Sequence, residues 1–117
     1  MDEQKSHNVY SECFEAVTKN FQNFPNVKII RGEVPGTLEE VRSEKICFIS
    51  LDMNCVEPEI AAINYFWNKL SRQGIVVLDD YNNIGHERQK EAFDEFAKDK
   101  KLKVMSLPTG QGLIIKR

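Results

Sequence analysis

Two short apolar runs that each end in aspartate constrain the fold of this chain more than any other feature. The first covers residues 46–51 and is followed by Asp52, and the second covers residues 75–78 and is followed by Asp79 and Asp80. Runs with nearly continuous hydrophobicity are typical of strands buried on both faces of a parallel sheet. The sequence therefore predicts an α/β domain with a mostly parallel sheet and helices on both faces.

Segments with helical periodicity precede, separate and follow these strands. Apolar side chains recur at steps of three and four over about residues 8–24, 58–70 and 87–98, which is the stripe of an amphipathic helix. Residues 65–67, Tyr-Phe-Trp, fall within the second helix at core spacing, so we interpret them as packing residues and not as a platform for a nucleic-acid base.

Shorter segments complete the predicted sheet. The β-branched run at residues 27–30 predicts a strand, and Thr37 with Glu40 has the spacing of a capping box at the start of a brief helix. Residues 102–107 and 113–115 are separated by Pro-Thr-Gly-Gln-Gly, which predicts an antiparallel hairpin at the sheet edge. Because this glycine turn lies between two late strands, it is not a dinucleotide-binding loop.

Length and composition bound the organisation of the chain. With 117 residues, of which 41% are hydrophobic, residues 1–117 can build one core and hence a single domain. A formal charge of −2 gives no broad basic field, so nucleic acid is not an expected partner. No apolar run reaches the roughly 20 residues needed to span a bilayer, and the N-terminus lacks a hydrophobic signal core. We expect a soluble, intracellular protein with no membrane partner.

The three cysteines add a prediction about compartment. Cys13, Cys47 and Cys55 are odd in number and lack the short paired spacings of zinc sites. They are interpreted as reduced, mostly buried thiols of a cytoplasmic protein.

The strand-end aspartates are the strongest candidates for chemistry. Parallel neighbouring strands would bring Asp52, Asp79 and Asp80 to a common rim beyond their carboxyl ends. Two or three carboxylates suffice to hold Mg²⁺, and without a cation their repulsion would favour a retained proton on one of them. The alternative is structural, since aspartate is common at strand ends because it suits turns and helix caps.

Each of the other polar residues near this rim has both a functional and a structural interpretation. His86 follows a glycine near the start of a helix, where it could be a base facing a substrate or a solvated loop residue. Asn54, Asn82 and Asn83 could orient a sugar-like or phenolic substrate, or could serve turns. A phospho-accepting receiver domain is excluded, because such domains place the acidic pair on the first strand and the single aspartate later.

Three segments together resemble a known family. They are Phe-Ile-Ser-Leu-Asp-Met-Asn at residues 48–54, Gly-Ile-Val-Val-Leu-Asp-Asp-Tyr at residues 74–81 and Gln-Lys-Glu-Ala-Phe-Asp-Glu-Phe at residues 89–96. They are similar to the macrocin O-methyltransferase family, which belongs to the class I, Rossmann-like methyltransferases. The resemblance extends from about Val17 to the C-terminus and is most specific at residues 74–81.

The resemblance implies a function and a set of site residues. Family members transfer a methyl group from S-adenosylmethionine to a hydroxyl, typically on a sugar, with Mg²⁺ bound by aspartates at these strand ends. Asp52, Asp79 and Asp80 would then be metal ligands, and Asp52 would also help deprotonate a small-molecule hydroxyl acceptor. His86, proposed from its position in the sequence and not from the resemblance, is the second candidate catalytic residue.

Two departures from the family pattern shape the prediction. Residues 54–56, Asn-Cys-Val, replace an acidic residue followed by Leu-Tyr. The family's first strand, its glycine-rich loop and its ribose-binding acid have no counterpart, so no cofactor-binding residue is assigned. We expect a truncated methyltransferase domain that is inactive alone. The alternative is a non-catalytic interaction domain, in which residues 27–30 pair beside residues 46–51 or leave an exposed edge that favours homo-oligomers.

Overall fold

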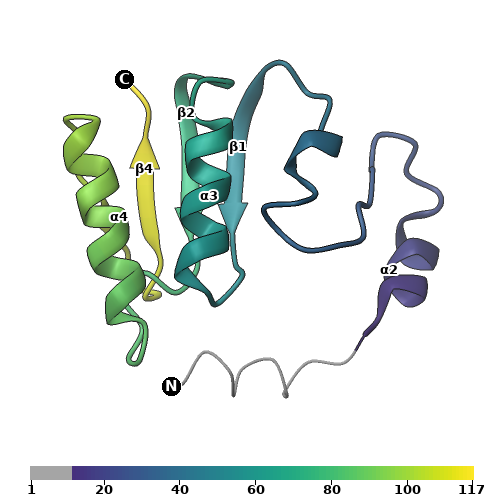
Figure 1. The fold of residues 1–117 in the computed structure, drawn as a ribbon, viewed down its shortest axis with the longest axis horizontal. Coiled ribbons are helices and arrows are strands. Elements are labelled where there is room, and N and C mark those ends of the chain that lie inside the picture. The colour runs from purple at the N-terminus through teal and green to yellow at the C-terminus, as the bar shows by residue number, and fades with distance from the viewer. Residues whose placement is uncertain (1–11) are drawn as a thin grey trace.

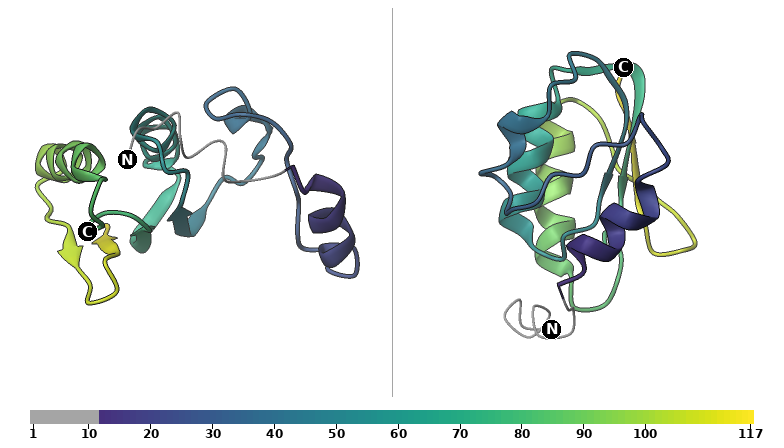
Figure 2. Two further views of the ribbon diagram at one scale, coloured as in Figure 1. Left: turned by 90° about the horizontal axis from the view of Figure 1, so that it is seen from below. Right: turned by 90° about the vertical axis from the view of Figure 1, so that its right-hand side faces the viewer.

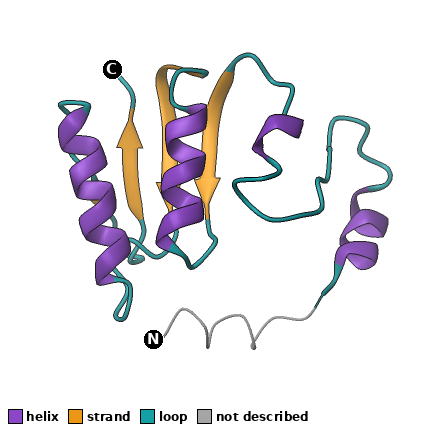
Figure 3. Cartoon of the chain, viewed as in Figure 1, coloured by secondary structure: helices purple, strands orange, loops and turns teal. Residues whose placement is uncertain are grey.

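The computed structural model describes residues 12–117, which form a four-stranded sheet with helices (Figures 1 and 3). The predicted first helix is present in its middle part, and its predicted start at residues 8–11 lies outside the described residues. In chain order the elements are α2 (Phe14–Phe21), the 3-10 helix η1 (Leu38–Glu40), β1 (Ile46–Leu51), α3 (Val56–Phe66), β2 (Leu70–Leu78), α4 (Glu87–Asp99), β3 (Met105–Ser106) and β4 (Gly112–Ile115).

The sheet has the strand order β1-β2-β4-β3. β1 and β2 are parallel, with Leu51 opposite Leu78, whereas β4 is antiparallel to both β2 and β3. The predicted α/β class and the C-terminal hairpin are thus confirmed. The sheet is mixed and has a smaller parallel share than expected, because β4 turns back and inserts beside β2.

One face of the sheet carries the core. α3 and α4 lie side by side on the same side of the strands, as both views of Figure 2 show. Trp67, just after α3, meets Phe96 of α4 edge to face with ring centroids 5.2 Å apart, a preferred aromatic geometry. The buried apolar side chains between sheet and helices are Leu51, Ala62, Ile63, Phe66, Trp67, Leu70, Val76, Leu78, Phe93, Phe96 and Ile114.

The opposite face corrects the prediction that both main strands are buried on two sides. Phe48, on the outer face of β1, is 56% exposed, and Ile115 and Met105 on the same face are also exposed. β1 is an edge strand, so within residues 12–117 no strand pairs with its outer side. α2 lies away from the sheet, beyond the segment that carries η1 (Figure 1), and none of its residues is buried. Helices therefore cover one face and not two in the described part of the chain.

Two short predicted elements between α2 and β1 differ from expectation. Residues 27–30 form no strand, because they find no strand partner; the Val27 amide instead donates to the Phe24 carbonyl, 3.1 Å away. The brief helix is present as η1, but without a capping box. The Thr37 hydroxyl donates to the Glu33 carbonyl at 3.3 Å and makes no cap bond.

Three side-chain predictions are also revised. Cys13 and Cys47 are exposed and Cys55 is half-buried, so the expectation of mostly buried thiols is wrong, although all three are free cysteines. The reason is that α2 and β1 each leave a face uncovered. Phe66 and Trp67 are core residues as predicted, whereas Tyr65 is exposed; its ring meets Phe66 edge to face and lies under the Lys69 ammonium group. No helix within residues 12–117 is long and apolar enough to cross a membrane.

Candidate metal centre

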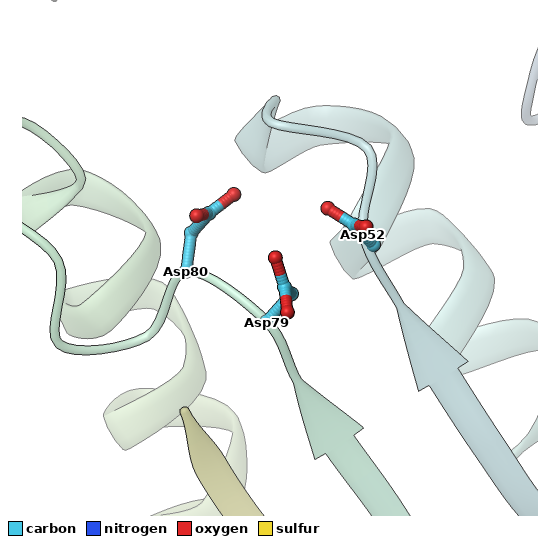
Figure 4. A group of neighbouring side chains, drawn as sticks. All are labelled: Asp52, Asp79 and Asp80. Atoms are coloured by element: carbon cyan, nitrogen blue, oxygen red, sulfur yellow. The ribbon is translucent and has the colours of Figure 1, made fainter. Parts of the chain in front are cut away.

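The acidic residues meet at the carboxyl edge of the parallel strand pair. Because β1 and β2 run in the same direction, both end at this edge, and the Asp79 amide donates to the Leu51 carbonyl at 3.0 Å just beyond the strands. Asp52, Asp79 and Asp80 each offer one carboxylate oxygen, and these oxygens all lie within 4.8 Å of one another. Figure 4 shows the three side chains converging on one space from the ends of the two strands. The predicted juxtaposition is therefore present.

Hydrogen bonds fix two of these carboxylates. Gln111, in the hairpin turn, donates from Nε2 to Asp79 at 3.0 Å, and Asn83 donates from Nδ2 to Oδ1 of Asp80 at 2.9 Å. The other oxygen of Asp80, Oδ2, is buried and has no hydrogen-bond partner; the His86 Nδ1 atom lies 4.0 Å from it. A buried carboxylate oxygen without a partner is costly, and a cation is one kind of group that would satisfy it.

The electrostatics of the cluster agree with a cation site. Partial burial, the negative charge and hydrogen bond of Asp79, and the charge of Asp80 all raise the pKa of Asp52. A carboxyl group with a raised pKa keeps its proton more readily, because ionisation would add a further negative charge to the cluster. A bound divalent cation would reverse this repulsion.

Local structure holds the turn that carries Asp52. Asn54 adopts a positive φ of 57°, which asparagine tolerates better than most residues, and Cys55 starts α3 without a side-chain cap bond. The carboxylate of Glu59 binds this turn from within the helix, since its Oε1 accepts the Met53 amide at 2.9 Å. The turn is thus tied to the first turn of α3.

The loop after Asp79 and Asp80 is anchored by Tyr81. Its ring is buried against Gly112, where an added Cβ would come within 2.6 Å of the ring. Its hydroxyl donates to Asp94 and accepts a hydrogen bond from Lys90 at 3.1 Å. Burial raises the pKa of Tyr81, and the hydrogen bond to Asp94 adds to that effect.

The remaining sequence candidates divide between the site and its surroundings. His86 occupies the N-cap position of α4 without a side-chain cap bond, is partly buried and lies beside Asp80, so it is not a solvated loop residue. Asn83 contacts Asp80 directly. Asn82 joins the hairpin turn through its backbone amide, which donates to Gly110 at 2.8 Å, and Asn54 shapes the turn after Asp52.

Three residues at this edge were missed by the sequence analysis. Gln111 bonds Asp79, and the buried pair Glu59 and Gln89 is joined by a hydrogen bond of 3.0 Å from Gln89 Nε2 to Glu59 Oε2. Glu59 could have been found, because it occupies an apolar-stripe position three, four and seven residues before Ala62, Ile63 and Phe66. Gln89 has the same relation to the stripe of α4. A polar residue within an apolar stripe indicates a buried polar contact.

Comparison with known proteins shows what this chain is similar to. A family model described as macrocin O-methyltransferase matches residues 1–107. A solved structure of the O-methyltransferase NovP superposes with a TM-score of 0.64 at 18% sequence identity, covering 87% of this chain and 44% of that one. The chain thus spans less than half the length of the NovP structure, and the part that superposes has the same fold. A search of curated proteins found no match.

Proposed function

Because the chain belongs to the macrocin O-methyltransferase family, we propose that its acidic edge is the metal- and acceptor-binding side of an S-adenosylmethionine-dependent O-methyltransferase. The observation that carries the proposal is the convergence of Asp52, Asp79 and Asp80 within 4.8 Å, with Asp80 Oδ2 buried and unpartnered. Three carboxylates in this arrangement fit Mg²⁺, which prefers oxygen ligands and keeps several waters. The reaction would transfer a methyl group to a hydroxyl.

The protein's own residues would prepare the acceptor. When bound, the cation lowers the pKa of a coordinated hydroxyl. Gln111 and Asn83 keep Asp79 and Asp80 oriented, as second-layer hydrogen bonds do at metal sites. Asp52 is the exposed member of the cluster, so an incoming hydroxyl reaches it first, and we assign it to help remove the hydroxyl proton.

We assign the acceptor to a hollow that is lined in part by residues shortly after Asp52. Its walls come from residues 32–34 and from Met53, Cys55 and Pro58, directly after Asp52. A small hydroxyl compound such as a sugar would place its reactive oxygen near the carboxylates by binding there. Holding the oxygen in line with the methyl donor is where such a site gains most of its rate.

The described residues do not fit the nucleoside cofactor. β1 leads into α3 and β2 into α4 through acidic turns, and within residues 12–117 no glycine-rich loop joins a strand to a helix. We therefore propose that this chain alone does not methylate and that further polypeptide supplies the cofactor side. A cytoplasmic location is proposed with it, since all three cysteines are free.

Calorimetric titration tests the metal site and the cofactor side separately. We expect saturable Mg²⁺ binding to the purified chain, lost in Asp79→Asn and kept in the control Asp99→Asn, which removes the same charge at the exposed end of α4. S-adenosylhomocysteine should not bind with or without Mg²⁺. Absence of Mg²⁺ binding would contradict the metal site, and stoichiometric nucleoside binding would contradict inactivity of the isolated chain.

A second candidate function is self-association through the uncovered edge. β1 is an outer strand with the uncharged sequence Ile-Cys-Phe-Ile-Ser-Leu, and its Phe48 side chain is 56% exposed. Natural edge strands usually carry lysine, proline or a cover that prevents pairing, and β1 itself contains neither lysine nor proline. A second copy of the chain, pairing edge to edge, would bury it.

Sedimentation velocity over a range of concentrations separates this candidate from a monomer. We expect a dimer that Ser50→Lys disrupts, because a charge on the edge strand opposes pairing. Ile84→Lys is the matched control, since it adds the same charge away from β1, at a side chain in the β2–α4 loop that is 98% exposed. A strictly monomeric wild-type protein at all concentrations would rule the candidate out.

A further inference from the structure

A second charged site lies at the edge of the sheet opposite the acidic cluster. The helices α3 and α4 end at this edge, and so does β4, beside the start of β2 (Figure 1). A hollow of about 350 Å³ opens between these ends. Its walls are Trp67, Lys100, Lys101, Leu102, Lys116 and Arg117. Four of the six wall residues are cations and none is acidic, so the hollow attracts anions.

The ammonium group of Lys116 is held in place by the protein itself. Lys116 follows β4, where its amide donates to the Gly74 carbonyl at 3.0 Å and its carbonyl accepts the Gln73 amide at 2.6 Å. Its Nζ atom donates to the carbonyls of Trp67 and Leu70, each at 2.7 Å. An ammonium group has three N–H donors, so one donor remains for a further acceptor.

A second ammonium group approaches the same indole ring. Nζ of Lys116 lies 5.3 Å from the centroid of the Trp67 ring, and Nζ of Lys100 lies 6.0 Å from it. Cation–π attraction offsets part of the cost of placing two like charges around one ring. Within residues 12–117, neither lysine forms an ion pair with a carboxylate, and the same holds for Lys101 and Arg117.

Two helix ends account for part of this positive charge. Basic residues are common after a helix C-terminus because about half a negative charge is concentrated there. Both α3 and α4 end at this hollow, which together supplies about one negative charge. The walls carry four cations, of which Lys116 and Arg117 follow a strand and not a helix. An excess of about three positive charges is therefore left for a ligand.

The backbone at Lys101 supports a role for its charge. Lys101 has a φ of 58° in the turn that ends α4, where its amide donates to the Lys98 carbonyl at 2.9 Å. Glycine is the usual residue at this position, because it adopts a positive φ without steric cost. A lysine there keeps a cation on the wall of the hollow at some cost in stability.

We propose that this hollow is a binding site for a soluble phosphate monoester with a small apolar or aromatic substituent. A monoester carries about 1.5 to 2 negative charges at neutral pH, which matches the excess charge better than the single charge of a carboxylate. The third N–H group of Lys116, together with Lys100 and Lys101, binds the phosphate oxygens. The side chains of Trp67 and Leu102 supply an apolar wall for the substituent.

The shape of the site favours a small molecule over a polymer or a membrane. Its volume falls at the lower end of the range of small-molecule pockets, about 300–1,000 Å³. Single-stranded nucleic acid requires a basic groove that follows the backbone over several nucleotides, and the four cations line one hollow instead. The site goes beyond the proposed methyl transfer and does not depend on it.

Fluorescence of Trp67 tests the site directly, because Trp67 is the only tryptophan of the chain. In buffer that contains a metal chelator, at constant ionic strength, we expect phenyl phosphate to change this fluorescence to saturation. Calorimetry of the same titration should give one ligand per chain. Inorganic phosphate should bind more weakly, because it lacks the apolar substituent.

Two variants distinguish the site from general surface charge. Lys101→Asn removes a wall cation and keeps the turn, because asparagine tolerates a positive φ. It should weaken binding of phenyl phosphate about tenfold, as expected for loss of a hydrogen bond to a charged group. Lys103→Gln removes the same charge from an exposed side chain that does not line the hollow, and should change Kd by less than about twofold.

Three outcomes would overturn the proposal. The first is no saturable binding of phenyl phosphate to the wild-type chain, a result that needs no variant to fold. The second is equal weakening by Lys101→Asn and Lys103→Gln, because the affinity would then reflect net charge alone. The third is binding to vesicles of anionic phospholipid without binding of phenyl phosphate, which would replace the soluble ligand with a membrane surface.

Discussion

Residues 46–117 and residues 12–45 contain similar patterns of apolar residues but bury them very differently. The first region encloses nearly the whole core, whereas Leu38 is the one buried residue among residues 12–45. α4 buries Phe93 and Phe96 against the sheet, and α2 has an equally periodic stripe and buries nothing. An amphipathic stripe thus indicates a helix, and a facing surface decides whether the stripe stabilises it.

The largest expected effect of this difference is on core truncation. Phe93→Ala, at a side chain that is 1% exposed, should lower the free energy of unfolding by about 3–5 kcal/mol. Phe21→Ala, at a side chain of α2 that is 45% exposed, should lower it by less than about 1 kcal/mol. Urea denaturation followed by circular dichroism measures both. Equal losses would show that α2 packs against something in solution.

Hydrogen exchange should show the same contrast along the backbone. Amides of β2 and β4 lie in the sheet centre, and we expect them to exchange through openings that cost about 5 kcal/mol or more. Amides of α2 should exchange through openings of about 1 kcal/mol, because an eight-residue helix without packing is marginal in water. Protection of α2 at a level similar to β2 would break the comparison.

A smaller effect is expected at the acidic edge. In buffer that contains a metal chelator, at neutral pH, Asp52→Asn should raise the free energy of unfolding by about 0.5 kcal/mol. This is the size of a solvent-screened interaction between two charges. The pKa of Asp52 is raised in the folded state, so its ionisation costs stability as the pH rises through that value, and the cost disappears on acidification. The variant should lack this slope in thermal unfolding measured at several pH values. Added Mg²⁺ should stabilise the wild type and not the variant.

The smallest effect on stability, and the most local readout, concerns the thiols. Cys47 on the outer edge strand and Cys13 are exposed and should react with a thiol reagent in the native state faster than half-buried Cys55. Cys47→Ser and Cys13→Ser assign the reacting groups with little change in unfolding free energy. Protection of Cys47 that increases with protein concentration, with Cys13 unaffected, would show that the open edge pairs with a second copy.

Much of the fold could be predicted because it follows from local pattern. The parallel pair, α3, α4 and the hairpin arise from apolar runs and turn residues within a few positions of each other, and the structure confirms them. The strand predicted at residues 27–30 failed for a nonlocal reason, since a β-branched run becomes a strand only beside a partner. The exposure of Phe48 and Cys47 has the same origin.

The site was predictable in its ligands and not in its supports. Asp52, Asp79 and Asp80 follow strands directly, so the parallel order alone brings them together. Glu59 and Gln89 lie 30 residues apart, and only the packing of α3 against α4 joins them. Their positions within apolar stripes are visible in the sequence, but the identity of each partner is a property of the folded structure.

The strand order also has a consequence for synthesis of the chain. β4 is the last of the four strands to leave the ribosome, yet it lies between β2 and β3. While residues 112–115 are still within the exit tunnel, β2 has a neighbour on one side only and β3 has none. The sheet therefore cannot assemble progressively during translation. It must close in a late step, and until then the nascent β2 is a second unpaired edge that a chaperone or another chain could bind.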